Sequence, residues 1–242
     1  TPVELTCVAL QYDDSAGPRL YTAAERGDVE RVLQCLGEPA DPDYRGEHQQ
    51  TPLMVAAIEG HAQVAALLIE AKADVDAVSI LDPGATALIM AAWNGHLAVV
   101  RLLCELGANK NHSAALGNTP LSQASGMGQP EVVRFLCDEG ADVHHQLAVG
   151  GGAPLHLAVL GSPFQPDYVN RLKWNDYALC VRYLLRARAD PDQRMAGLGP
   201  TPLDIALRTG AHSSITAALQ TAQVQRTSAA RFGARLLRNA LG

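Results

Sequence analysis

Apolar residues recur along this chain in blocks that resemble one another. The segment from Thr51 to Asp76, TPLMVAAIEGHAQVAALLIEAKADVD, is followed by TALIMAAWNGHLAVVRLLCELGANKN from Thr86 to Asn111. In both segments, two apolar runs with helical spacing stand on either side of a Gly-His pair. The pattern predicts two short helices per segment, which face each other across a turn.

The repeat can be counted from the threonine of the Thr-Pro-Leu motif. Successive anchors lie 33 to 35 residues apart, except for one step of 48 before the last copy. A glycine stands nine residues after each anchor except the fifth. The chain therefore contains six copies, anchored at Pro18, Thr51, Thr86, Thr119, Ala153 and Thr201.

The residues of one copy predict its local structure. Thr51 is suited to cap a helix, and Pro52 to occupy its first turn, where a missing N–H costs nothing. Gly60 can adopt a positive φ and end that helix. Because one helix pair of this size buries too little apolar surface to fold alone, the copies are expected to stack into a solenoid.

The repeated phrase resembles the ankyrin repeat, a 33-residue unit with the Thr-Pro-Leu-His and Gly-His motifs. The best matches are APLHLAV at 153–159, NGHLAVVRLLCELGANKN at 94–111 and EVVRFLCDEGADV at 131–143. The resemblance covers roughly residues 18–223. It implies an all-α repeat solenoid of helix-turn-helix units joined by β-hairpin-like turns. Pro18 and Ala153 depart from the motif, since neither carries a capping hydroxyl.

Charge and composition divide the chain into three parts. All 25 acidic residues lie at or before Asp204, whereas residues 205–242 carry five arginines and no acid. We expect an extended arm at 1–17, whose apolar alternation is typical of a strand, and a solenoid at 18–223 with an insertion near 160–176. A basic amphipathic tail at 224–242 completes the chain.

Candidate catalytic and metal-binding groups are few. The resemblance assigns His61, His96 and His156 a structural role, in which they orient turns through hydrogen bonds. The glycine run at 150–152 lacks the Lys-Ser/Thr pair of a phosphate-binding loop. No spacing indicates a catalytic triad or a zinc site. We therefore expect no enzyme activity, no cofactor, no metal and no small-molecule substrate.

The five cysteines form no Cys-x-x-Cys pair, and we expect reduced thiols in a reducing compartment. No apolar stretch reaches the roughly 18 residues of a membrane-spanning helix. The cytoplasm is the first expectation for localisation. Because the chain begins with Thr1 rather than Met, an organelle reached through a removed targeting peptide is the alternative.

The family resemblance also implies a binding surface. In ankyrin repeats the concave face is built from the turn tips and from the two residues after the Ala-Ala pair of each inner helix. An apolar centre with a charged rim is typical of a protein-binding hot spot. The alternative for Trp93 is simple packing between copies. The predicted residues are Glu25, Arg26, Ile58, Glu59, Trp93, Asn94, Met127 and Arg208.

The insertion and the tail are further candidates for contact with a partner. Phe164, Tyr168 and Trp174 fall in a proline- and glycine-containing loop, where they could contact a partner or seal the gap between copies five and six. The tail could cap the last repeat, lean on the acidic body, dock on a partner, or contact a membrane or nucleic acid. Its predicted contact residues are Arg231, Phe232, Arg235, Leu236 and Arg238.

The sequence thus favours a non-catalytic protein-interaction module, a scaffold or adaptor subunit of a larger assembly. One alternative is a regulatory, inhibitory or positioning subunit of an enzyme complex. A second is an adaptor that binds a membrane surface or nucleic acid through the arginine-rich tail, which we consider the less favoured reading. The identity of the protein partner cannot be read from a repeat scaffold, because function lies in its exposed side chains.

Overall fold

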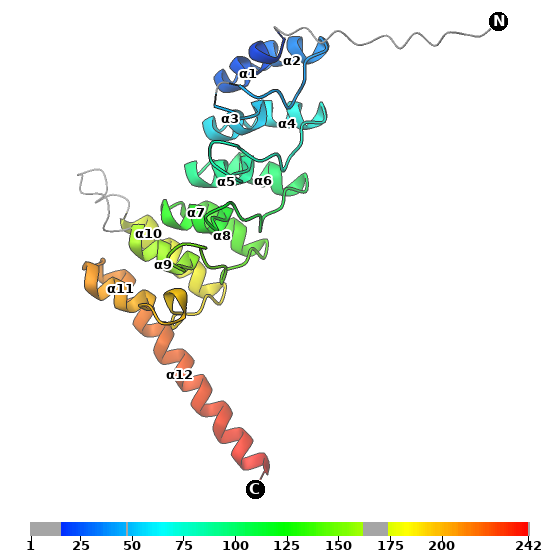
Figure 1. The fold of residues 1–242 in the computed structure, drawn as a ribbon. Coiled ribbons are helices and arrows are strands. Elements are labelled where there is room, and N and C mark those ends of the chain that lie inside the picture. The colour runs from blue at the N-terminus through cyan, green and yellow to red at the C-terminus, as the bar shows by residue number, and fades with distance from the viewer. Residues whose placement is uncertain (1–15, 47, 162–173, 242) are drawn as a thin grey trace, which may run out of the picture.

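The computed structural model describes residues 16–46, 48–161 and 174–241, without the side chains of Trp174 and of residues 230–241. Helix pairs stack one on the next along the molecule, and the last helix projects from the end of the stack (Figure 1). The first fifteen residues of the predicted arm lie outside the described residues.

Each of the six copies contributes an inner helix and an outer helix. The inner helices are α1 (Ala16–Arg26), α3 (Pro52–Glu59), α5 (Ala87–Asn94), α7 (Pro120–Gly126), α9 (Pro154–Gly161) and α11 (Pro202–Thr209). The outer helices are α2 (Val29–Gly37), α4 (Ala62–Glu70), α6 (Leu97–Glu105), α8 (Pro130–Asp138), α10 (Trp174–Arg186) and α12 (Ser213–Leu241). A short 3₁₀ turn, η2 (Met195–Gly197), precedes α11.

Threonine caps set the start of the inner helices, as predicted. The side-chain oxygen of Thr51 accepts the backbone N–H of Met54, and Thr86, Thr119 and Thr201 cap their helices in the same way. At Ala153, which has no hydroxyl, Nδ1 of His156 accepts the backbone N–H of Ala153 at 3.2 Å. His156 therefore retains one half of a capping box, and its predicted structural role is confirmed.

The core runs between neighbouring copies. Small buried alanines on the inner helices allow close approach, and large side chains from both inner and outer helices fill the remaining space. The largest fully buried side chains are Leu20, Leu53, Met54, Leu68, Leu88, Leu103, Leu121, Leu136, Leu155, Leu184, Ile215 and Leu219. Since every copy buries its apolar faces against the next, the solenoid is the folding unit.

A side-chain donor after most inner helices binds the copy before it. Nε2 of His96 lies 2.8 Å from the carbonyl oxygen of Ile58, and Nε2 of His61 lies 3.2 Å from that of Glu25. Gln129 donates to the carbonyl of Trp93, and Tyr177 to that of Gly126, so two other residue types continue the series. The predicted hydrogen-bonding role of both Gly-His histidines is confirmed.

The loops between copies carry a second ladder of bonds. One carboxylate or amide oxygen at each turn accepts the backbone N–H of the next turn. The pairs are Asp43 with Asp74, Asp76 with Asn109, and Asn111 with Asp142, at 2.9 to 3.1 Å. At the next equivalent position stands His144, which accepts a bond through its own carbonyl from Gln193 instead.

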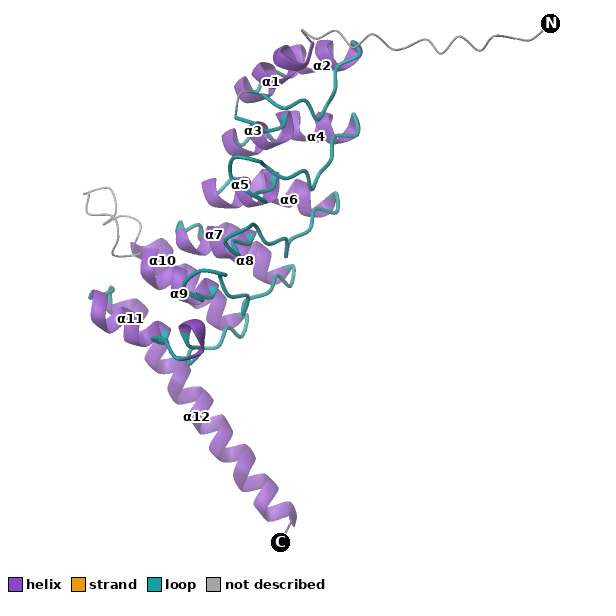
Figure 2. Ribbon diagram, in the orientation of Figure 1, coloured by secondary structure: helices purple, strands orange, loops and turns teal. Residues whose placement is uncertain are grey.

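The predicted all-α repeat fold is confirmed. In the described parts of the chain the loops form no strand, and backbone bonds such as Ser79 N–H to Ala85 O close each one like a small hairpin (Figure 2). The first inner helix begins two residues before the predicted anchor Pro18.

The last helix differs from the short tail helix that the sequence suggested. α12 runs without a break from Ser213 to Leu241, so the predicted boundary between residues 223 and 224 falls inside it. The physical reason is that no proline or glycine interrupts the chain between Ser213 and Phe232. The solenoid and the tail therefore share one helix.

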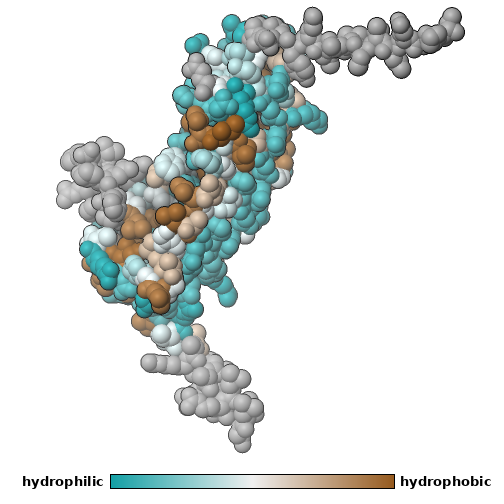
Figure 3. Space-filling view, in the orientation of Figure 1, coloured by the Kyte–Doolittle hydropathy of each residue, from teal (hydrophilic) through white to brown (hydrophobic). Residues whose placement is uncertain are grey.

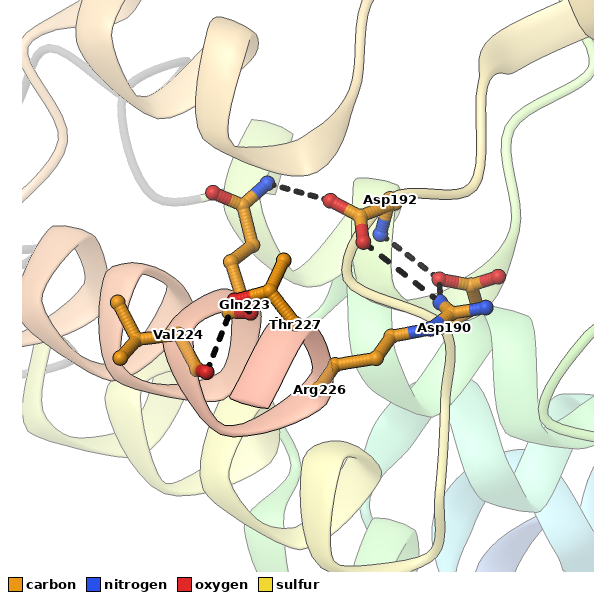
Figure 4. A network of polar contacts seen from close by, with 6 residues as sticks. All are labelled: Asp190, Asp192, Gln223, Val224, Arg226 and Thr227. Carbon is orange, nitrogen blue, oxygen red and sulfur yellow. Dashed lines mark hydrogen bonds and ion pairs between the residues drawn. The ribbon is translucent and has the colours of Figure 1, made fainter. Parts of the chain in front are cut away.

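The middle of α12 is fixed to the last inter-copy loop (Figure 4). The guanidinium of Arg226 pairs with Asp190 and lies 3.8 Å from Asp192, while Nε2 of Gln223 donates to Asp192 at 2.8 Å. Ile215 and Leu219 of the same helix are fully buried. This part of α12 covers the end of the stack and bonds to its last acidic loop, and of these contact residues only Arg226 belongs to the predicted tail.

The insertion is described only at its edges. α9 ends at Gly161 and α10 begins at Trp174, and Phe164 and Tyr168 lie between them, outside the described residues. Tyr177, directly after the insertion, is buried and donates its hydroxyl to Gly126.

Candidate protein-binding surface

An apolar groove crosses the inner helices of copies two to four. It has a volume of about 270 Å³. The apolar part of its lining consists of Ile58, Ile89, Met90 and Trp93. Of these four residues, Ile89 and Met90 are buried. Polar side chains complete the lining: Gln50, Asp82, Asn94 and Gln123. We call this site the Trp93 groove.

Trp93 combines exposure with a fixed position. Its side chain is 45% exposed, a large apolar area for a residue on a helix, while its own carbonyl is held by Gln129 of the next copy. The ring lines the groove and remains open to solvent, so contact with a partner and packing between copies both stay predictions for Trp93. A large exposed aromatic ring on a rigid support is typical of a binding hot spot.

The polar rim of the groove contains one carboxylate. Asp82 comes from the loop above α5, and its side chain forms no ion pair or hydrogen bond within the described residues. Asn94 is held by the carbonyl of Met90 at 3.1 Å, which orients its amide. The rim can therefore supply one negative charge and several amide groups to a bound segment.

Exposed apolar side chains also stand at the tips of four successive loops. Their exposed fractions lie between 58% and 94%. Hydrophobic residues gather in patches down the face of the stack seen in Figure 3, bordered by hydrophilic surface. We call the exposed apolar residues at the loop tips the fingertip set: Ile80, Leu81, Leu116, Val149 and Leu198.

Backbone bonds connect neighbouring loops and make this surface rigid. Ala115 donates its N–H to Pro83, and Ala148 donates to Leu116, both at 2.9 to 3.0 Å. Gly117 permits the second approach, since a Cβ there would lie 2.4 Å from the backbone nitrogen of Ala148. The loops that carry Ile80, Leu81, Leu116 and Val149 are consequently held on a connected frame rather than independently.

The structure brings only some of the predicted contact residues together. Ile58, Trp93 and Asn94 line the Trp93 groove, whereas Glu25, Glu59 and Arg208 are exposed outside its lining. Arg26 lines a separate hollow of about 350 Å³ between α1 and α2. Met127 was expected beside Trp93, but it forms the partly buried C-cap of α7, and Gln123, one turn earlier, lines the groove instead.

The predicted tail contacts Arg231, Phe232, Arg235, Leu236 and Arg238 lie where the structure describes only the helix backbone, and the side chain of Trp174 is likewise outside the description. These predictions remain open.

Sequence reasoning missed the fingertip set and Asp82. The signal was present, because Leu81, Leu116, Val149 and Leu198 each stand three to five residues before an anchor. An apolar residue in a predicted turn, however, gives no indication of whether it folds inward.

The described residues include few groups suited to metal binding or catalysis. They contain no group of three or more His, Cys, Asp or Glu placed to hold a metal ion, and none of their helices is long and apolar enough to cross a membrane. Cys35, Cys104, Cys137 and Cys180 are free thiols. Burial raises the pKa of Cys104 to about 11 and that of Cys137 to about 12, so both stay protonated and unreactive near neutral pH.

Comparison with known proteins follows the repeats. A family model described as ankyrin repeats (3 copies) matches residues 20–114 and 84–147, which together cover more than half of the chain. The human ankyrin repeat and KH domain-containing protein 1 is 34% identical over 110 residues, which are 46% of this chain. Its Drosophila melanogaster counterpart, named mask, is 38% identical over 111 residues. The mouse histone-lysine N-methyltransferase EHMT1 is 36% identical over 63 residues, or 25% of this chain.

These relatives are far longer than the matching segment. The matches span 4% of the human protein, 3% of mask and 5% of the mouse methyltransferase. The likeness therefore concerns the repeats and not the other parts of those proteins.

Proposed function

Because the chain belongs to the ankyrin-repeat family, whose repeats generally mediate protein–protein interaction, we propose that it is a non-catalytic scaffold or adaptor that binds a partner protein across the Trp93 groove and the fingertip set. The relatives support this role indirectly, since the segments that match this chain are small parts of much longer proteins.

The observation that carries the proposal is the half-exposed ring of Trp93 beside Ile58 in an apolar groove. An aromatic ring that is rigidly held and surrounded by a polar rim can bury a large area at low entropic cost on binding. The fingertip set extends the apolar surface over neighbouring copies, so the partner is expected to contact several copies at once.

The test begins with the full chain as bait in a pull-down from its native source, followed by mass spectrometry. Affinity for the recovered partner is then measured with wild-type protein and with Trp93→Ala. We expect binding to weaken by about 30-fold, which corresponds to about 2 kcal/mol. The melting midpoint of the variant should change little.

Leu33→Ala is the matched control. Leu33 is an apolar side chain of similar exposure, 52%, but it lies on the outer helix α2 away from the groove. Its replacement should leave affinity unchanged. Equal affinity of wild type and Trp93→Ala would place the partner elsewhere. Severe loss of stability with full binding by the folded fraction would make Trp93 a packing residue.

A further inference from the structure

A second groove lies between the last two outer helices, away from the Trp93 groove. Its volume is about 670 Å³. From α10 it is lined by Ala178, Arg182, Leu185 and Arg186, and from α12 by Ser214, Ala217, Ala218, Thr221, Ala222 and Gln225. We call it the α10–α12 groove.

The floor of this groove is apolar and shallow. Ala178 is buried, and Leu185, Ala218 and Ala222 are half-buried, so four small or aliphatic side chains face the opening. Interaxial distances between packed helices depend on the side chains at the contact, and alanines permit close approach. The groove can therefore receive the apolar side of another helix.

The wall on α10 carries unbalanced positive charge. Arg182 and Arg186 stand one turn apart on α10, both are exposed, and neither forms an ion pair or hydrogen bond within the described residues. Like charges at this spacing destabilise an isolated helix. An anionic group between them would turn this repulsion into attraction.

Among the residues that the structure describes, no acidic side chain lies at this position. Asp138 shares a different hollow with Arg186 but forms no ion pair with it among the described residues. Asp190 is already paired with Arg226. α12 contains no acidic residue along its whole length.

We propose that the α10–α12 groove binds an acidic amphipathic helix of a partner protein. Its carboxylates contact Arg182 and Arg186, and its apolar side rests on the alanines and on Leu185. Nucleic acid is the less suitable occupant. Phosphate-driven binding depends on many cationic contacts, and an apolar floor gives a phosphate backbone nothing to bind.

The test uses a fluorescent peptide of about fourteen residues, with glutamates on one helical face and leucine and alanine on the other. Binding to the full chain is followed by anisotropy at low and moderate salt. The whole chain has a net charge of −6, so general electrostatics oppose this peptide and only a local site can capture it.

The key variant is Arg182→Glu with Arg186→Glu in one chain. We expect it to weaken peptide binding at least about tenfold. The control, Arg31→Glu with Lys72→Glu, changes the net charge equally at two exposed residues outside the groove and should bind as wild type does. Ala217→Trp, which fills the groove without changing charge, should also weaken binding.

Three results would overturn the proposal. One is equal peptide binding by the Arg182/Arg186 variant and the control. Another is loss of binding when Arg231, Arg235 and Arg238 are replaced by serine, which would move the site to the tail. The third is tighter binding, through Arg182 and Arg186, of a DNA duplex or of phosphatidylserine vesicles than of the peptide.

Discussion

Nε2 of His96 lies 2.8 Å from the carbonyl oxygen of Ile58 in the preceding copy. This carbonyl sits at the end of an inner helix, where no later residue of α3 can reach it. His96→Ala removes the donor and leaves a partly buried acceptor, so we expect the free energy of unfolding to fall by about 1–3 kcal/mol. Urea denaturation measures the change.

His48→Ala serves as the comparison for His96→Ala, because His48 is exposed and should change stability by less than about 0.5 kcal/mol. If the two variants unfold at the same urea concentration, the bond between copies does not contribute.

Gly60, the C-cap of α3 in the copy before His96, has two tasks, and a pair of variants separates them. Gly60 adopts φ +81°, and a Cβ there would lie 2.5 Å from Nδ1 of His96. Gly210 adopts φ +67° but has no neighbouring atom within 4 Å of such a Cβ. Gly210→Ala should therefore cost only backbone strain, about 1–2 kcal/mol, whereas Gly60→Ala should cost about 1–3 kcal/mol more.

The extra cost at Gly60 depends on the imidazole ring. Introducing His96→Ala into the Gly60→Ala chain should recover part of it, and a double-mutant cycle from urea denaturation quantifies the coupling. A coupling of zero would mean that the ring moves away freely.

The stability of copy five should depend on pH through His156. Burial lowers the pKa of this side chain below its ordinary value of 6.5, and the backbone near Gln193 and Pro200 opposes the shift only in part. The folded state thus favours the neutral ring. Its contribution to stability is complete above about pH 6.5 and is lost as the pH falls through the lowered pKa.

His156→Gln provides the measurement, since glutamine can accept the N–H of Ala153 but does not titrate. Between about pH 7.5 and about pH 5.5 the wild type should lose more unfolding free energy than this variant. Parallel losses in the two proteins would assign the acid sensitivity to other groups.

Two truncations test how α12 secures the end of the stack. A chain that stops after Ala229 keeps Gln223 and Arg226, and it should melt as the full chain does. A chain that stops after Gln220 loses both contacts to Asp192 and should be less stable by about 1–2 kcal/mol. Hydrogen exchange at residues 190–210 should quicken only in the shorter chain, and protection kept in both would show that Ile215 and Leu219 suffice.

The sequence predicted those features that depend on residues close together in the chain, namely where the helices start and end. The Thr-Pro anchors and the glycines act within a few residues, so they located the helices without any knowledge of packing. The convergence of Ile58 and Trp93 followed from equal spacing in two adjacent copies. Met127 does not share this spacing, because the residue equivalent to Ile58 and Trp93 in the next copy is Gly126, while Met127 is equivalent to Asn94 and forms the C-cap of α7.

Other features depended on contacts between distant residues. Nothing within Ile80 or Leu116 indicates that their side chains stay exposed, since that outcome depends on how neighbouring loops bond to one another. The continuity of α12 was not predicted, because acidic residues are absent from the end of the sequence and this change in composition suggested that a new segment begins there.

Asp192 holds the position at which Asp43, Asp76 and Asn111 each accept the backbone N–H of the following copy. Its two carboxylate oxygens already face Gln223 and Arg226 (Figure 4). A seventh copy appended behind α11 would have to compete with these side chains for the same acceptor. The helix α12 thus occupies the acceptor through which the loop of a copy stacked behind α11 would be bonded, and it closes that end of the stack to a further copy of the same kind.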